Sequence, residues 1–229
     1  MIQAIITDVT RMRRPNVCVA GLYQGTPIRL DSPQPTEQWL SSVGGLRPGD
    51  VVSLNWRPAR SVVRPHSEDG EWDPSTFSRV SQLSEDELTK ELSTAAYSRV
   101  REAFGTPWFH AGNGNAAFRP GRGPRSLASV IVSRVRPYPY REGIRVDFAD
   151  SQDSWAMAPL EDLMVRRHQS GCRTCSSRLA ALLAGEFEGT QALLRVGLAR
   201  QFQAGGHPSA CYLQVNHILL MPSRRQHFL

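Results

Sequence analysis

The chain opens with an alternating apolar segment, AIITDVTR at residues 4–11, which is echoed by ASVIVSRVR at residues 128–136. In both places a turn with Arg and Pro follows, then a second alternating segment and, after a tight connection, a third. Alternation of apolar and polar residues is typical of β-strands that bury one face. The echo therefore predicts two similar small β-units, each with basic residues at the same turn.

Length and composition agree with two β-rich units. The chain has 229 residues, and its 18 Gly and 16 Pro suit short strands joined by turns better than a helical bundle. Strands are expected in the first unit at 2–9, 16–23, 26–31, 51–56 and 60–64, with a short helix within 33–44. In the second unit they are expected at 127–136, 143–149, 153–158, 191–202 and 210–221, with a helix from 159 to 187 that breaks near Gly171.

Three strands, a helix and two strands is the order of an oligonucleotide-binding (OB) barrel. The predicted fold is mainly β with helices, as two OB-like five-stranded Greek-key barrels in tandem. The first barrel is expected at 1–105, ending in an amphipathic helix over 84–104 that Ser84 and Glu87 start with a capping-box pattern. A Gly-, Pro- and Arg-rich linker follows at 106–125, and the second barrel, with its helix between strands three and four, is expected at 126–229.

Several segments also resemble a described bacterial family, the dual OB-containing domain proteins. They are the opening ITDVTRM, the strand VCVAG with IR after it, the segment PHSED at 65–69, and the closing RVGLAR and YLQVN. The resemblance spans most of the chain. It implies two OB-like barrels and a nucleic-acid role, as an accessory subunit of a defence system against phage or of a repair system. It implies no catalytic residues.

The basic charge also favours a nucleic-acid partner. The net charge is +6, and Lys90 is the single lysine among 27 basic residues. A skew toward Arg also accompanies GC-rich genomes, so the placement of the arginines is the better guide. They gather at the echoed turn and in the linker, whereas acidic residues concentrate at 68–91 and 147–162. This segregation favours a polyanionic partner.

Arg and aromatic residues interleave in the second barrel and in the linker, which is the combination that holds single strands through phosphates and stacked bases. The alternative is that the tyrosines pack the barrel mouth while the arginines are only solvated. The predicted nucleic-acid-binding residues are Arg11, Arg13, Arg14, Trp108, Arg122, Arg134, Arg136, Tyr138, Tyr140, Arg141 and Arg145.

The four cysteines divide into two kinds. Cys18 and Cys211 lie in alternating apolar segments and are expected to be small buried hydrophobes. Cys172 and Cys175, with His168 before them, have the spacing of half a zinc site. A second ligand pair is missing, so no cofactor is expected, and zinc is the alternative.

The leading hypothesis is a non-catalytic protein that binds single-stranded DNA or RNA. An alternative is a scaffold subunit that docks a partner protein. A third hypothesis, a metal-dependent enzyme, would use the acidic segment with His66 at 65–71. Neither a long apolar run nor a leader pattern is present, so a cytoplasmic protein without a membrane partner is expected.

Overall fold

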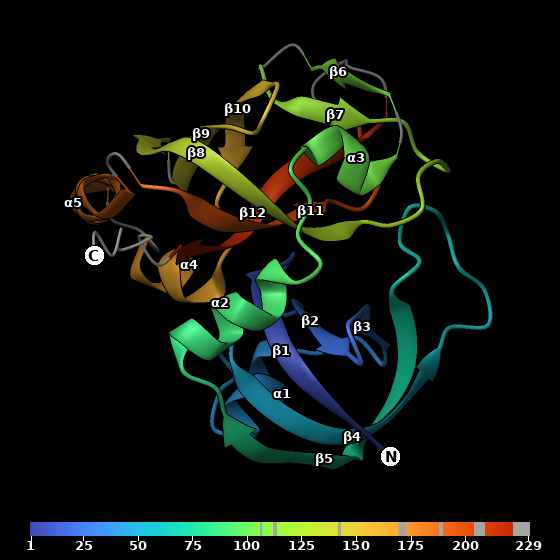
Figure 1. The fold of residues 1–229 in the computed structure, drawn as a ribbon. Helices are drawn as coiled ribbons and strands as arrows, with labels where there is room; N and C mark the ends of the chain where they lie inside the picture. The colour runs from blue at the N-terminus through green and yellow to red at the C-terminus, as the bar shows by residue number, and fades with distance from the viewer. Residues whose placement is uncertain are drawn as a thin grey trace, which may run out of the picture.

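The computed structural model describes residues 1–105, 107–111, 114–141, 143–169, 173–187, 190–203 and 209–221. Most of this part of the chain is β-strand, arranged as one closed five-stranded barrel and one curled seven-stranded sheet (Figure 1). We call these the N-terminal barrel and the C-terminal sheet. The predicted fold class, mainly β with OB-like barrels and accessory helices, is confirmed.

The N-terminal barrel closes in the order β1-β2-β3-β5-β4. Its elements are β1 (Ile2–Arg11), β2 (Val17–Tyr23), β3 (Thr26–Ser32), α1 (Glu37–Ser42), β4 (Asp50–Pro58) and β5 (Asp69–Gln82). The barrel interior is apolar and includes Val19, Leu30 and Leu54, each at most 2% exposed. Gly21 on β2 permits the tight β1–β2 pairing, because a Cβ there would lie 2.6 Å from the Ile5 carbonyl oxygen.

The fifth strand of this barrel differs from the sequence expectation. Residues 60–64 were expected to be a strand, but they belong to a loop in which Val62 and Val63 are exposed. The strand is β5, which pairs parallel with β3 and antiparallel with β4. The second half of β5 is mostly exposed, so its sequence lacks the apolar alternation by which a half-buried strand is recognised.

The C-terminal sheet repeats the same arrangement. Its strands run in the order β10-β9-β8-β11-β12-β7-β6, and a parallel bridge between Leu160 and Val215 brings the end of β10 beside β12. The elements after the first barrel are α2 (Glu85–Ser93), α3 (Val100–Phe104), β6 (Trp108–His110), β7 (Ala116–Phe118), β8 (Leu127–Tyr140), β9 (Gly143–Ala149), β10 (Ser154–Pro159), α4 (Leu163–Gln169), α5 (Arg173–Phe187), β11 (Ala192–Leu198) and β12 (Cys211–Leu220). As in an OB barrel, the helices α4 and α5 fall between the third and fourth strands. The predicted break at Gly171 and the glycines at 205–206 lie outside the described residues.

Two further segments differ from expectation. The predicted helix over 84–104 is interrupted, because Tyr97 forms a parallel bridge with Val130, its N–H donating to the Ser129 carbonyl (2.9 Å). It is therefore split into α2 and α3.

The segment expected as a linker, 106–125, contains β6 and β7, which form a hairpin, and β7 extends the C-terminal sheet from β12. Tertiary pairing overrides the local Gly- and Pro-rich pattern here.

The two units are joined through buried contacts. Figure 1 shows the barrel and the sheet on either side of α2 and the end of β1. Arg195 on β11 pairs with Asp8 on β1, with Nη2 to Oδ2 at 2.7 Å and both side chains at most 2% exposed. Arg195 also donates to Ser129 (3.0 Å) and Thr7 (3.2 Å). A charge pair buried this completely requires both units to be in place.

Candidate nucleic-acid interface

A groove runs between the N-terminal barrel and the C-terminal sheet. Its deep part is a cavity of about 350 Å³ between the turn after β1 and the segment after β11. A second hollow of about 310 Å³ adjoins it and shares Ala199, Phe202 and Gln214 as lining residues. We call the two together the central groove. The deep part is lined by residues from both units, so the pairing of the units creates it, whereas the adjoining hollow is lined by the C-terminal unit alone.

Phe202 stands where the two hollows meet. Its side chain is 47% exposed, and one face of its ring rests on Tyr212, with ring centroids 4.6 Å apart. Tyr212 is itself buried, at 5% exposure. A phenyl ring held from below and open above is a platform on which a planar base can stack.

Guanidinium groups lie at both ends of the groove. Arg11, Arg13 and Arg200 line the deep part, and Arg145 lines the adjoining hollow. Arg200 donates to Asp69 Oδ2 at 2.6 Å and also pairs with Asp31, so its orientation is fixed by two carboxylates. Burial lowers the pKa of Arg145 from its ordinary value. Its Nη1 donates to the Met157 carbonyl at 3.2 Å.

The floor of the deep part rests on a buried polar network. Arg29 Nη1 donates to Asp69 Oδ1 (2.8 Å), and Nη2 donates to Ser126 Oγ (2.8 Å). His66 Nδ1 lies 3.1 Å from Arg29 Nη1 and 2.9 Å from Ser126 Oγ. Glu68 accepts hydrogen bonds from the backbone N–H (2.7 Å) and hydroxyl (3.0 Å) of Ser126. The network joins β3 and the loop before β5 to the start of β8.

This network also accounts for the acidic segment 65–71. The sequence offered His66 and its neighbouring carboxylates for metal binding or acid–base work. In the structure Glu68 and Asp69 are at most 5% exposed and hold Arg29, Arg200 and Ser126. Their lone pairs are thus used for joining the two units. Residues of the segment PHSED, part of the family resemblance, form this junction.

The predicted binding residues of the first turn divide into two groups. Arg11 and Arg13 line the central groove, as described above. Arg14 points elsewhere, because its Nε lies 3.4 Å from Glu37 Oε1 at the start of α1. The turn after β1 therefore contributes two of its three arginines to the groove.

The predicted residues of β8 and β9 lie around Arg145. Arg145 and Arg141 each stack on the Tyr140 ring, 5.4 Å from its centroid. Tyr138 is half-buried, and its hydroxyl donates to Asp147 Oδ1 (3.1 Å). Burial, with Asp147, raises the pKa of Tyr138 to about 12. Arg134 and Arg136 are exposed on β8.

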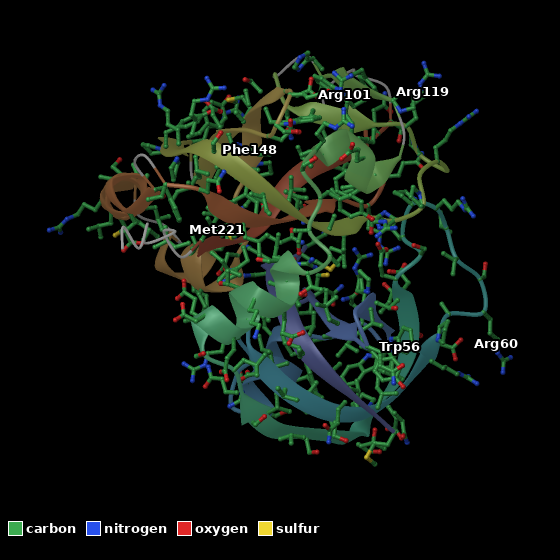
Figure 2. The ribbon with its side chains drawn as sticks, viewed as in Figure 1. Trp56, Arg60, Arg101, Arg119, Phe148 and Met221 are labelled. Carbon is green, nitrogen blue, oxygen red and sulfur yellow. The ribbon has the colours of Figure 1, made fainter. Side chains whose placement is uncertain are left out.

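Trp108 and Arg122 lie outside the groove lining. Trp108 packs against Trp155, with centroids 4.7 Å apart, beneath the Arg101 guanidinium at 5.1 Å. Arg122 is exposed in the segment before β8, which meets the loop before β5 through a hydrogen bond from Gly121 N–H to the Arg64 carbonyl (3.1 Å). These two segments form a ridge of exposed arginines, Arg60, Arg64, Arg119 and Arg122; Figure 2 shows Arg60 and Arg119 projecting from the same side of the molecule.

The sequence missed four residues of these surfaces, Arg60, Arg64, Arg200 and Phe202. The sequence predicts Arg60 and Arg64 in a strand, and Arg200 and Phe202 within a strand over 191–202, whereas β11 ends at Leu198. A signal was present in each case. Pro58 and Pro65 bracket the loop, and the alternation of the β11 segment is only partial, so both strand assignments were weak at those residues.

Most of the residues predicted as zinc ligands lie outside the described part of the chain. The side chain of His168 and the whole of Cys172 lie outside the described residues, while Cys175 is exposed on α5. Among the residues that the structure describes, no group of His, Cys, Asp and Glu could hold a metal ion. Cys211 is buried as expected, Cys18 is partly buried, and burial raises the pKa of both thiols.

No described helix has the length and apolar character needed to span a membrane. No protein-family model and no curated protein matches the chain, so membership of the dual OB-containing family stays a prediction.

Solved structures similar to this chain have low sequence identity. They include the p204 HINb domain, at 9% identity and a TM-score of 0.37, covering 96% of this chain and 95% of that one. The tetrameric p202 HIN2 is 10% identical with a TM-score of 0.34, covering 96% and 91%. A murine DNA-binding protein bound to double-stranded DNA is 7% identical with a TM-score of 0.35, covering 96% and 95%.

Proposed function

We propose that this chain binds single-stranded DNA or RNA along the central groove, without catalysing a reaction on it. The observation that carries the proposal is the pairing, in one groove, of cationic ends with an exposed aromatic platform. Arg11 and Arg13 lie at one end and Arg145 at the other, with Phe202 between them. Phosphates are attracted by the guanidiniums, and bases stack on the ring.

A single strand fits this arrangement better than a duplex does. The stacking face of Phe202 lies inside a groove lined from two sides. Bases within a duplex are already stacked on each other and present only their edges, so they have no free face for such a platform. The exposed ridge of Arg60, Arg64, Arg119 and Arg122 offers further phosphate contacts for a strand that leaves the groove.

Fluorescence anisotropy with labelled single and double strands tests the proposal. Replacing Arg11 and Arg13 together by Ala should weaken single-strand binding by about tenfold or more at low salt. Phe202→Ala removes a stack of about 1–3 kcal/mol, whereas Phe202→Tyr keeps the ring and should bind nearly as wild type. Arg178→Ala, an exposed arginine on α5 outside the groove lining, is the matched control.

Two outcomes would contradict the proposal. One is the absence of any single-strand binding at low salt, and the other is equal binding of a duplex with no effect of Phe202→Ala. The scaffold alternative is separated by charge reversal at Arg134, Arg136 and Arg141. If the scaffold alternative holds, the charge-reversed variant should lose a partner protein, and not nucleic acid, on purification.

A further inference from the structure

His66 lines the deep part of the central groove and has a polar atom without a hydrogen-bond partner. The side chain is 3% exposed and lines the cavity, and its Nε2 has no hydrogen-bond partner. A buried polar atom without a partner is destabilising, so folded proteins rarely keep one without a use. Its position at a cavity makes a ligand atom the natural partner.

The surroundings of the ring fix which nitrogen carries the proton. Arg29 is always charged and can only donate, so Nδ1, 3.1 Å from Arg29 Nη1, must accept. The Ser126 hydroxyl accepts from Arg29 Nη2 and lies 2.9 Å from Nδ1 and 3.0 Å from Glu68 Oε2, so its single proton can go to either of these two acceptors. A neutral imidazole that accepts at Nδ1 carries its hydrogen on Nε2. Nε2 is therefore an unpartnered donor on a residue that lines the cavity.

The ring stays neutral at physiological pH. Burial, with the guanidiniums of Arg29 and Arg200, lowers the pKa of His66 to about 3, although Asp69 opposes them. A neutral N–H donor at the floor orients the acceptor atom of a ligand but carries no net charge. It suits a carbonyl or ring-nitrogen acceptor of a base better than a phosphate, which favours charged donors.

The rim and the floor of the deep part differ in the kind of side chain that lines them. Arg13 is exposed and Arg11 partly exposed at the rim. The floor combines the His66 donor with the apolar surfaces of Cys18 and Leu127 and the amide of Gln214. Amide side chains and apolar walls are what proteins use to hold base edges and faces. The cavity of about 350 Å³ is within the size range of small-ligand pockets.

We propose that the deep part of the central groove holds one nucleobase turned out of the strand, with an acceptor atom of the base on His66 Nε2 and the adjoining phosphates on Arg11 and Arg13. This deepens the proposed function and rests on it. The same chemistry is offered by a free nucleotide, so the test includes one.

The test compares three probes by anisotropy and competition: a labelled thymidine oligonucleotide, the same backbone made of abasic sites, and free thymidine monophosphate. Wild type should bind the base-bearing strand more tightly than the abasic strand. His66→Phe fills the same space without an N–H and should lose about tenfold for the base-bearing strand. Its affinity for the abasic strand should match that of wild type.

The outcomes separate the two proposals. Binding of both strands that His66→Phe leaves unchanged would overturn the base site and keep the groove proposal. Binding of the monophosphate as tight as that of the strand would keep the base site and overturn the strand proposal. Binding of none of the probes would overturn both.

A second measurement covers the possibility that His66→Phe does not fold. Long-range ¹H–¹⁵N spectra of wild type report the protonation of each imidazole nitrogen. The expected result is a protonated Nε2 on His66 and a shift of that resonance on addition of the thymidine oligonucleotide but not of the abasic strand. A proton on Nδ1, or a resonance unmoved by the base-bearing strand, would overturn the base site.

Discussion

Individual buried side chains do two jobs in this protein. Arg29 donates to Asp69 and Ser126, Glu68 accepts from Ser126, and these contacts join the two units beside His66, which lines the groove. Sequence reasoning predicts that the arginines of the first turn contact a ligand, which stays a prediction, and it interprets 65–71 as an exposed polar loop, which the structure contradicts. It could not do otherwise, because the partners of that segment, such as Ser126, are about sixty residues away.

The low pKa of His66 predicts how the free energy of unfolding depends on pH. Because the folded pKa, about 3, lies below the ordinary histidine pKa of 6.5, the unfolded chain binds a proton that the folded chain excludes between these two pH values. The titration of His66 should therefore lower the free energy of unfolding as pH falls from about 6.5 toward 3. Urea unfolding of wild type and His66→Phe across this range measures the effect.

Carboxylates titrate in the same range, so the difference between the two proteins is the quantity of interest. The stability difference between wild type and His66→Phe should favour wild type most at neutral pH and shrink on acidification. His66 would have an ordinary pKa in the folded state if that difference were constant from pH 7 to 4.

At the scale of elements, the β-meanders were predictable and the segments between them were not. The strands β1, β2 and β3, and again β8, β9 and β10, form where the sequence alternation predicts them. β9 buries alternate residues, whereas β1 is buried on both faces from Ile6 to Thr10. The exposed half of β5 and the interrupted helix gave no such pattern. Tyr97 leaves the helix because its backbone completes a bridge to Val130, a partner that local propensity does not record.

The helix α2 connects the two units. Leu88 and Leu92 are at most 2% exposed and form one cluster with Leu22 of the barrel and with Leu193 and Leu219 of the sheet. A side chain packed at this meeting point should matter to both units at once.

We expect Leu92→Ala to lower the free energy of unfolding by about 2–5 kcal/mol, because the cavity lies where neither unit can close it alone. Urea unfolding followed by circular dichroism and by tryptophan fluorescence should remain a single coincident transition. Leu182→Ala is the control, since that side chain is 68% exposed on α5 and its loss should change stability little. An equally small effect of Leu92→Ala would show that α2 does not stabilise the junction.

The whole molecule places its charges on surfaces that the fold creates. Arginines from β1, from the segment after β11 and from β9 meet at the central groove, although they are far apart in sequence. The groove in turn depends on the buried Arg195–Asp8 pair and on the Arg29 network that hold the units together. The echo in the sequence predicted two units; the groove arises from their pairing, which no repeat pattern encodes.

The salt dependence of binding should distinguish the groove arginines from one another. The logarithm of the association constant for a single strand falls linearly with the logarithm of salt, by about 0.7 for each phosphate neutralised. Arg11→Ala and Arg13→Ala together should therefore reduce the slope by about 1.4. Arg200→Ala should reduce it less, because Asp31 and Asp69 already balance that guanidinium.

Arg178→Ala should leave the slope unchanged, since Arg178 is on α5 and does not line the groove. Anisotropy titrations from about 50 to 200 mM salt give the slopes. Equal reductions for the Arg178 and the Arg11 and Arg13 variants would mean that affinity comes from the overall charge of +6. A reduction confined to the groove variants would mean that the strand lies where the two units meet, because only there do the arginines of the first turn approach those of the sheet.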